Sequence, residues 1–362
     1  MSVGKFFIRK KKSIDESIQA AIIKQHYRKQ YSDILKFKSN DLPVEVTKQS
    51  IDTVWNKYLP VNPKWAQYYW SINSIASPYY IPSDIWFSRI CRKLNSLEFF
   101  GWPQFQDKNY LDIVFRGVCQ PGIIVRNIAG QFLDSGFNNI DIDRAIELCQ
   151  CEKEIIIKPS ISSKWGRGIE FVDTSQNGPD SLLLLLKNRG RNFVIQKVIQ
   201  QHHNMAWLNA DSINSIRIQT LLWNNQVHVL SSLVRIGVKG CRIDNPHSSN
   251  GVSCVLTPEG KMIQTAYDRE WNPMDVLPNG SAPDGFEVPF YNRIIETVKK
   301  LQYRVPHSRL VGWDMTVSDD GEPILIEANL DYPEVYFHQI GKGPIISDPG
   351  LFDEIMSYVF HK

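Results

Sequence analysis

The stretch that decides the fold is Val311-Gly-Trp-Asp-Met-Thr-Val317, followed after a short loop by Pro323-Ile-Leu-Ile-Glu-Ala-Asn329. Apolar and polar residues alternate along both segments, which is typical of strands that have one buried face. The loop between them contains Asp320-Gly321, a dipeptide favoured in hairpin turns. The sequence therefore predicts an antiparallel hairpin with one apolar and one polar face.

The position of the turn predicts which residues face each other across this hairpin. A loop of two or four residues centred on Asp320-Gly321 gives three pairs on the polar side: Asp314 with Glu327, Gly312 with Asn329, and Thr316 with Leu325. The other side then carries only apolar pairs: Trp313 with Ala328, Met315 with Ile326, and Val317 with Ile324. Facing residues lie about 5 Å apart at Cβ, so the two carboxylates are expected to be neighbours. A three-residue loop would shift this register.

Two acids that face each other on a sheet repel unless a cation lies between them. Asn329 adds an amide oxygen on the same side, two residues beyond Glu327. Carboxylate and amide oxygens are the ligands that Mg²⁺ prefers, with phosphate and water completing its shell. We therefore predict that Asp314, Glu327 and Asn329 bind Mg²⁺. The simpler alternative, an exposed acidic hairpin edge, leaves the amide on that face unexplained.

A second segment suited to phosphate lies earlier in the chain. The apolar run Ile155-Ile-Ile157 predicts a buried strand that ends in Lys158, whose ammonium group needs an anion to offset burial. The stretch Ser160–Gly168 follows, rich in hydroxyl groups, cations and glycine, and backbone N–H groups in such a loop bind phosphates. A Walker A loop and the GxGxxG motif are both absent. Without the lysine and the hairpin, an ordinary surface loop would explain the stretch.

Length and composition exclude several classes of protein. A chain of 362 residues, 43% hydrophobic and 22% charged, is typical of globular proteins with more than one core. Its longest leucine run, Leu182–Leu186, is too short to span a bilayer, and no secretory signal follows the basic Arg9–Lys12, so we expect a cytoplasmic protein. The six cysteines form no CxxC pair and are expected to be reduced. A net charge of +3 gives no reason to expect nucleic acid as a partner.

The order and spacing of these features resemble the ATP-grasp superfamily. Lysines occur in Asp107-Lys108-Asn109 and Ile157-Lys158-Pro159, ahead of the loop and the acidic hairpin. D-alanine–D-alanine ligase and glutathione synthetase share this plan. The segments Ser212–Ile218, Leu233–Gly237 and Asn250-Gly251 look more like the sugar-transfer-associated subgroup. The resemblance covers about residues 100 to 345.

The resemblance implies an α+β ATP-grasp fold, in which the nucleotide lies between two α+β lobes, with a helical N-terminal extension. Four regions are expected: a basic helical N-terminal extension (1–48), a helix-rich N-terminal domain (49–135), the small lobe (136–200), and the C-terminal lobe with the metal site (201–362). The tryptophans and tyrosines of the second region are interpreted as core, with base stacking as the alternative. The basic residues of the extension are interpreted as a solvated helical face. Docking to glycan-biosynthesis enzymes or an anionic membrane is the alternative.

The resemblance also implies residue roles and the cofactors ATP and Mg²⁺. The residues that would contact the nucleotide are Lys108 and Lys158 at the phosphates, Gly166 and Gly168 in the loop over them, Gln196, Lys197, Val198 and Ile199 at the adenine, and His203 or His202 at the ribose. Arg217 and Arg235 would be catalytic contacts to phosphate and acyl phosphate. Asn245, Asn250 and Gly251 would bind substrate. Two departures are Asn250-Gly251 in place of Gly-Gly and Gly312 in place of an arginine of D-alanine–D-alanine ligase. Either Arg235 takes the role of that arginine or the acyl acceptor differs.

The resemblance implies an ADP-forming carboxylate–amine ligase that works through an acyl phosphate. Its substrates would be an amino acid or similar acid and an amino sugar or peptide-like acceptor of polysaccharide or surface-glycan biosynthesis. Tyr332, Tyr336 and His338 could line the acceptor site, although core packing explains them equally well. A phosphotransferase acting on a hydroxyl group and a non-catalytic ATP-binding scaffold are the alternatives.

Overall fold

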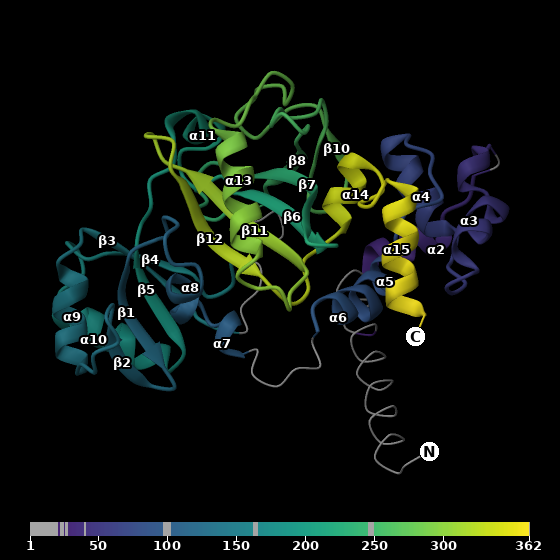
Figure 1. The fold of residues 1–362 in the computed structure, drawn as a ribbon. Helices are drawn as coiled ribbons and strands as arrows, with labels where there is room; N and C mark the ends of the chain where they lie inside the picture. Colours follow the sequence, from purple (N-terminus) through teal and green to yellow (C-terminus); the bar gives the residue numbers. More distant parts are fainter. Residues whose placement is uncertain are drawn as a thin grey trace, which may run out of the picture.

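The computed structural model of the chain describes residues 21, 25, 28–39, 41–96, 103–161, 166–244 and 250–361 (Figure 1). These residues form a small lobe, a larger central lobe and a helical body, each with its own cluster of buried apolar side chains. The basic run Arg9–Lys12 lies outside the described residues, so the solvated face predicted for the extension, and docking as its alternative, both stay predictions. No helix in the described ranges is long and apolar enough to cross a bilayer.

The small lobe contains a five-stranded antiparallel sheet of order β2-β1-β5-β3-β4. Its strands are β1 (Ile123–Ile128), β2 (Gln131–Asp134), β3 (Glu154–Pro159), β4 (Glu170–Asp173) and β5 (Phe193–Lys197). Helices α9 (Ile142–Gln150) and α10 (Pro179–Arg189) cover one face (Figure 1), where Ile155 and Ile157 are buried. Because strand side chains alternate, Lys158 points to the opposite face. Strands β1 and β2 lie in the range expected for the helix-rich domain, yet they pair within this sheet, so the domain limits stay a prediction.

The central lobe contains a seven-stranded antiparallel sheet of order β10-β9-β8-β7-β6-β11-β12. Its strands are β6 (Ile216–Trp223), β7 (Gln226–Ile236), β8 (Val252–Val255), β9 (Ala266–Tyr267), β10 (Pro273–Met274), β11 (Leu310–Val317) and β12 (Pro323–Asn329). Helix α13 (Tyr291–Gln302) covers one face, and its Ile294 and Val298 belong to the same buried cluster as Trp313. Helix α11 (His203–Leu208) adds Met205 and Leu208 to that cluster.

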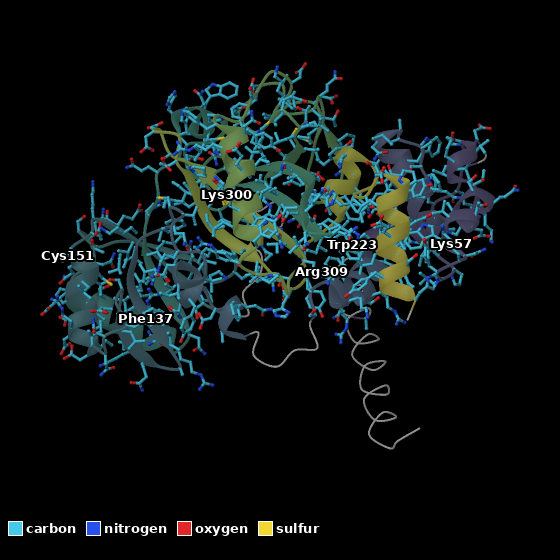
Figure 2. The ribbon with its side chains drawn as sticks, in the orientation of Figure 1. Lys57, Phe137, Cys151, Trp223, Lys300 and Arg309 are labelled. Atoms are coloured by element: carbon cyan, nitrogen blue, oxygen red, sulfur yellow. The ribbon has the colours of Figure 1, made fainter. Side chains whose placement is uncertain are left out.

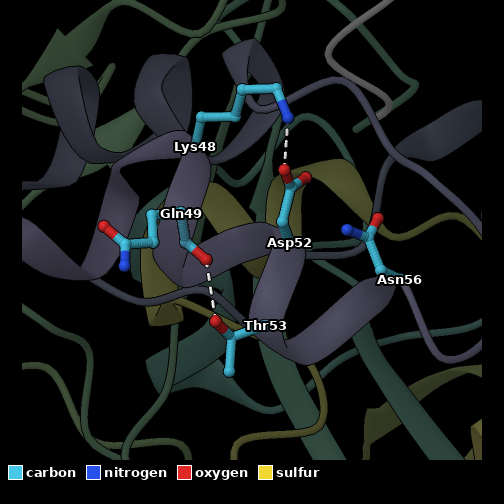
Figure 3. Close-up of a pocket in the computed structure, with 5 residues that line it drawn as sticks. All are labelled: Lys48, Gln49, Asp52, Thr53 and Asn56. Atoms are coloured by element: carbon cyan, nitrogen blue, oxygen red, sulfur yellow. Dashed lines mark hydrogen bonds and ion pairs between the residues drawn. The ribbon is translucent and has the colours of Figure 1, made fainter.

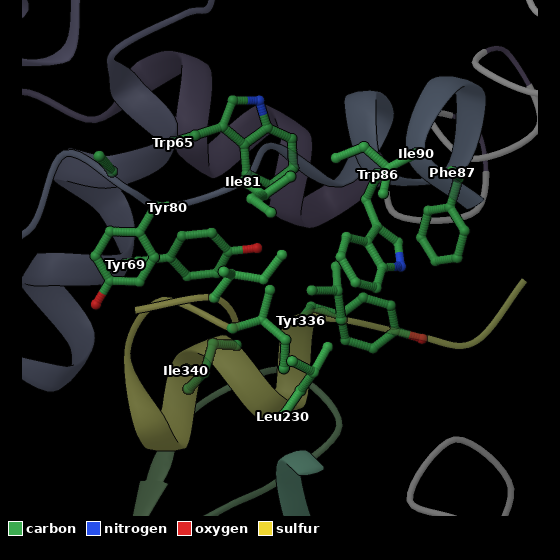
Figure 4. Packing of buried hydrophobic residues seen from close by; sticks show 14 of the residues in the cluster. Trp65, Tyr69, Tyr80, Ile81, Trp86, Phe87, Ile90, Leu230, Tyr336 and Ile340 are labelled. Atoms are coloured by element: carbon green, nitrogen blue, oxygen red, sulfur yellow. The ribbon is translucent and has the colours of Figure 1, made fainter. Parts of the chain in front are cut away.

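The helical body joins segments from both ends of the chain. Its elements are α2 (Arg28–Lys36), η1 (Val44–Val46), α3 (Lys48–Trp55), α4 (Lys64–Asn73), α5 (Ser83–Ile85), η2 (Trp86–Ile90), α6 (Cys91–Leu94), α14 (Tyr336–Lys342) and α15 (Pro349–Phe360). Trp65, Tyr69 and Trp86 lie in one apolar cluster with Tyr336 and Ile340 of α14 (Figure 4). This burial confirms that the aromatic density marks a core.

Ring contacts also join this body to the central lobe. At the end of β6, Trp223 meets Tyr358 of α15 edge to face, with ring centroids 5.2 Å apart, and Arg309 lies beside both rings (Figure 2). The elements α7 (Pro103–Gln106), η3 (Lys108–Tyr110) and α8 (Leu111–Val114) precede the small lobe. The α+β prediction is confirmed by these two sheets and their helices.

The β11–β12 hairpin confirms two of the predicted polar pairs and corrects the third. Asp314 faces Glu327 and Gly312 faces Asn329. Thr316 faces Ile324 and not Leu325, because the register shifts by one residue after Asp314. The loop between the strands has five residues, and β12 carries one extra residue as a bulge. The predicted apolar pairs shift with it: Trp313 with Ala328 is confirmed, whereas Met315 faces Leu325 and Val317 faces Pro323.

Trp313→Ala is expected to lower the free energy of unfolding by about 3–5 kcal/mol, the range for deleting a buried aromatic side chain. Trp313 is fully buried, and its Nε1 donates a hydrogen bond of 2.7 Å to Thr220. Trp207, which is 57% exposed, provides a matched control, and Trp207→Ala should change stability far less. Urea denaturation of both variants measures this, and equal losses would contradict the placement of Trp313.

Candidate active site

The sheet face opposite α13 carries a row of charged side chains on neighbouring strands. Arg217 on β6 faces Asp314 on β11, which in turn faces Glu327 on β12. Arg235 on β7 lies two residues beyond Leu233, the partner of Arg217, and therefore on the same face. Four strands thus present two acids and two arginines side by side.

Asp314 is held by both arginines. Its Oδ1 lies 2.5 Å from Nε of Arg217 and its Oδ2 lies 2.8 Å from Nη2, a two-pronged ion pair. Nη1 of Arg235 lies 3.4 Å from the same Oδ1. Burial alone would raise the pKa of Asp314, but the two guanidinium groups outweigh it and hold that pKa below its ordinary value. The aspartate is therefore ionised, and its charge is balanced by residues of the sheet itself.

Lys108, just before the small lobe, and Lys158, on β3 of the small lobe, lie at the same site. Nζ of Lys108, on η3, lies 2.9 Å from Oε1 of Glu327. The backbone N–H of Lys108 donates to the carbonyl of Ser160, which fixes η3 against the end of β3. The pKa of Lys158 is lowered to about 8. Burial is the largest cause, the charge of Glu327 opposes it, and the charge of Lys108 adds to it. Glu327 is thus the acid at which the two lysines and the seven-stranded sheet meet.

The oxygen atoms of Asp314, Glu327 and Asn329 suit a hard divalent cation. They come from facing or alternate positions of one hairpin face, and the Nδ2 of Asn329 is already a donor to Gly312 O and Asp314. Its carbonyl oxygen is then the atom that a cation would use. Asp314 and Glu327 are each paired with basic side chains. A metal ion that binds the two carboxylates must displace these side chains, which then need another anion as partner. Phosphate would supply that anion.

A model of the sugar-transfer associated ATP-grasp family matches residues 89–349, most of the chain. The chain belongs to this family. Membership confirms the predicted family and fold, and the predicted ATP and Mg²⁺ as cofactors. No curated protein matches the chain in sequence.

Several solved structures are similar to this chain at low sequence identity. An L-amino acid ligase from Bacillus licheniformis is 14% identical, with a TM-score of 0.34, over 70% of this chain and 43% of that one. A D-Ala:D-Ser ligase from Enterococcus faecalis is 14% identical, with a TM-score of 0.41, over 71% and 61%. The biotin carboxylase domain of a Hydrogenobacter thermophilus 2-oxoglutarate carboxylase, solved with MgADP and bicarbonate, is 14% identical, with a TM-score of 0.43, over 72% and 46%. The chain thus covers less than two thirds of each of these structures.

The ATP-grasp loop expected over the phosphates returns to β3. Gly166 and Gly168 have φ values of +72° and +74°, which only glycine adopts readily. A Cβ on Gly168 would lie 2.9 Å from the ring of Pro159, beside Lys158, so the loop end is close to that lysine. Residues 162–165 and the predicted Asn245 lie outside the described residues.

The other predicted substrate contacts lie at one end of the sheet. Asn250 is exposed with a φ of +55°, and Gly251 directly precedes β8. Because Arg235 pairs with Ser253 in the β7–β8 ladder, both residues lie close to the Arg235 end of β7. Gly312 is tightly packed, since a Cβ there would meet Pro333 at 3.1 Å.

The predicted adenine segment leaves the small lobe at the end of β5. Gln196 is buried and faces Ile123 of β1, and the N–H of Lys197 donates to Gly122 O at 2.8 Å. The side chain of Lys197 forms an ion pair with Glu152 and so points away from the charged row. Val198 and Ile199 follow as the connection to the central lobe. Their contact with adenine stays a prediction.

The predicted ribose contact His203 lies beside the hairpin loop. Its Nδ1 and backbone N–H both contact Oδ1 of Asp319, at 2.9 and 2.8 Å. The ring of His203 stacks on that of His202 at 4.1 Å, while His202 caps α11 by accepting from the N–H of Asn204. Within the described residues these three side chains could bring ligand atoms within 4.8 Å of one another. His203 therefore lies beyond the Val317 end of β11, whereas the charged row crosses that strand at Asp314.

Two acids near the charged row were not among the predicted site residues. Glu334 lies 3.7 Å from Arg235, and Asp244 accepts a hydrogen bond from the N–H of Ser215 at 2.8 Å. Burial raises the pKa of Asp244. Neither belongs to a strand, so periodicity gave no signal for them. A hollow of about 550 Å³ on α3, lined by Lys48, Gln49, Asp52, Thr53 and Asn56, contains none of these residues (Figure 3).

Binding of ATP is expected to take up a proton at alkaline pH, because the pKa of Lys158 is lowered to about 8 and phosphate favours its charged form. Below that pKa the lysine is charged with or without nucleotide. At about pH 9 most of one proton should be taken up per ATP bound. The unfolded chain also binds more protons between about 8 and 10.5, so the stability of the free protein should rise with pH in that window.

Isothermal titration calorimetry in buffers of different ionisation enthalpy measures this uptake. Lys158→Arg should bind ATP without it, since arginine stays charged. Lys153→Arg, an exposed lysine just before β3, should behave as the unchanged protein. Equal uptake by Lys158→Arg and the unchanged protein would contradict the assignment.

Proposed function

We propose that this chain is an ATP-dependent, ADP-forming carboxylate–amine ligase that works through an acyl phosphate. The observation that carries the proposal is the meeting at one sheet face of four cations and two acids from separate elements. Lys108 and Lys158 come from the small-lobe side, and Arg217 and Arg235 from the sheet. Such a set suits a triphosphate, a divalent cation and a carboxylate together.

The lysines and the oxygen ligands have separate tasks in this scheme. Lys108 and Lys158 bind the phosphates of ATP, and Asp314, Glu327 and Asn329 hold Mg²⁺. Mg²⁺ held there would supply positive charge beside the transferred phosphoryl group. When phosphate arrives, the lysine and arginine contacts now made to Glu327 and Asp314 are exchanged for contacts to phosphate oxygens.

The reaction needs no nucleophile from the protein. A substrate carboxylate oxygen attacks the γ-phosphorus, the bond to the β-phosphate oxygen breaks, and ADP leaves. An amine then attacks the acyl carbon, phosphate leaves, and the amine loses a proton. Arg235 and Arg217 would stabilise charge on the acyl phosphate. Catalysis then consists of positioning and charge stabilisation, where one donor typically contributes 10²–10³ in rate, or about 3–4 kcal/mol.

The substrates we propose are an amino acid or similar acid and an amino sugar or peptide-like acceptor in polysaccharide or surface-glycan biosynthesis. The description of the family as associated with sugar transfer supports this choice. The basic N-terminal residues would dock the chain to glycan enzymes or to a membrane surface.

Hydroxylamine distinguishes a ligase from a phosphotransferase. With ATP, Mg²⁺ and a pool of carboxylic acids, hydroxylamine should trap the acyl phosphate as a hydroxamate, detected with ferric iron, together with one ADP. ADP formed only with hydroxyl substrates and without hydroxamate would indicate a phosphotransferase. ATP binding without any ADP from either pool would indicate a scaffold, and both outcomes overturn the ligase.

Glu327→Gln should reduce ADP formation by about 10²–10³-fold while the protein stays folded, because the amide keeps the size of the side chain but loses its charge. Glu322→Gln is the matched control, since Glu322 lies on the same hairpin, is half exposed and pairs with Arg293. ADP release at saturating ATP and circular dichroism measure activity and folding. Full activity of Glu327→Gln would show that Glu327 is no cation ligand.

A further inference from the structure

Three buried polar side chains on the charged face of the sheet have no task in the scheme above. Gln219 on β6 faces Ser231 on β7, and Ser253 on β8 faces Arg235. Their exposed fractions are 0%, 5% and 3%. Within the part of the chain that the structure describes, both amide atoms of Gln219 and both hydroxyl oxygens lack a hydrogen-bond partner.

The segment that covers this face carries matching groups. His338 on α14 is fully buried, and neither ring nitrogen has a hydrogen-bond partner among the described residues. One carboxylate oxygen of Glu334, four residues earlier, is also buried without a hydrogen-bond partner among the described residues. Helix α14 packs on β7 and β8, and Pro333 lies against Gly312. The unpaired groups therefore lie on both sides of one interface.

Unpaired buried polar groups cost free energy, and folded proteins leave few of them. Several such groups at a single interface, beside the cations of the proposed active site, indicate that a ligand supplies the missing partners. By contrast, Gln302, fully buried on the opposite face of the same sheet, has both amide atoms paired: Oε1 accepts from Thr220 and Nε2 donates to Ser308 O.

The charges at this interface show which ligand fits. Arg235 is held loosely, at 3.4 Å from Asp314 and 3.7 Å from Glu334, whereas Arg217 is fully engaged by Asp314. Burial, and next Arg217 and Arg235, hold the pKa of His338 well below its usual range, so its ring is neutral and offers one donor and one acceptor. A guanidinium group and a carboxylate side by side complement a carboxylate and an ammonium group on one small molecule.

We propose that the interface between β6–β8 and the segment 334–338 binds an α-amino acid. Its carboxylate lies at Arg235 and its ammonium group at Glu334. A polar side chain of the amino acid contacts Gln219, Ser231 and His338. This inference rests on the proposed ligase and names the class of acid that it activates, since the carboxylate would lie beside Asp314 and the phosphate-binding lysines.

Thermal-shift and calorimetric binding of single amino acids to the full chain, without nucleotide, tests the proposal. A subset of amino acids with polar side chains should raise the melting temperature and bind at millimolar concentration or better. Absence of binding by all twenty would overturn the proposal. Binding of glucosamine at this site in place of any amino acid would overturn it too, because the interface would then hold an acceptor.

Gln219→Leu separates a binding role from a packing role. An apolar side chain of similar size removes the unpaired amide, so the free protein should melt at the same or a higher temperature. The same change should weaken amino acid binding at least tenfold. Gln226→Leu, at an exposed position of β7, should alter neither measurement. Unchanged binding by Gln219→Leu, or a lower melting temperature, would contradict the proposal.

Glu334→Gln tests recognition of the ammonium group. The unchanged protein should prefer the amino acid to its 2-hydroxy analogue by at least tenfold, and Glu334→Gln should lose this preference while still binding the hydroxy acid. Glu259→Gln, at an exposed position, is the control. A preference that survives Glu334→Gln would overturn the assignment of Glu334.

The binding and hydroxamate measurements fail independently. A chain that binds amino acids but forms no ADP retains this site and overturns the ligase. A chain that forms hydroxamates from acids lacking an amino group, and binds no amino acid, retains the ligase and overturns this site.

Discussion

The ion pair between Asp314 and Arg217 is the interaction on which the rest of the structure depends. Both groups are almost fully buried on two interior strands of the seven-stranded sheet, where either charge alone would carry a large desolvation cost. Their facing positions on β11 and β6 align the strands that present Glu327 and Arg235. The ion pair that offsets the cost of burying these two charges therefore also positions the residues of the proposed active site.

The second organising contact joins the two lobes. Lys108 precedes the small lobe, and its ion pair with Glu327 brings that side of the molecule to the edge strand β12. Lys158, on β3, interacts electrostatically with the same Glu327 and Lys108. These acids and bases form ion pairs with one another. The site is thus preorganised in position, while its charges remain available for exchange with a more highly charged ligand.

The sequence predicted the features that depend on neighbours along the chain. Alternation and an Asp-Gly turn paired Asp314 with Glu327 correctly, but the predicted loop of two or four residues was wrong, and the pair forms because the bulge in β12 compensates for a five-residue loop. An apolar run was enough to place Lys158 near a strand end. The engagement of Asp314 by Arg217 required the β6–β11 pairing, which spans nearly a hundred residues. His338 and Glu334 lie in a segment without strand periodicity, and only its packing on β7 and β8 brings them to the charged face.

The bulge in β12 has a consequence for how this hairpin tolerates change. Side chains on a strand alternate between faces, so a five-residue loop and a regular ladder would by themselves place Ile326, and not Glu327, opposite Asp314. The extra residue restores the parity of the strand before the acid is reached. The pairing of Asp314 with Glu327 therefore depends on the loop and the bulge together. A one-residue change in the loop or in the bulge, made without the other, would turn the side chain of Glu327 toward the apolar core.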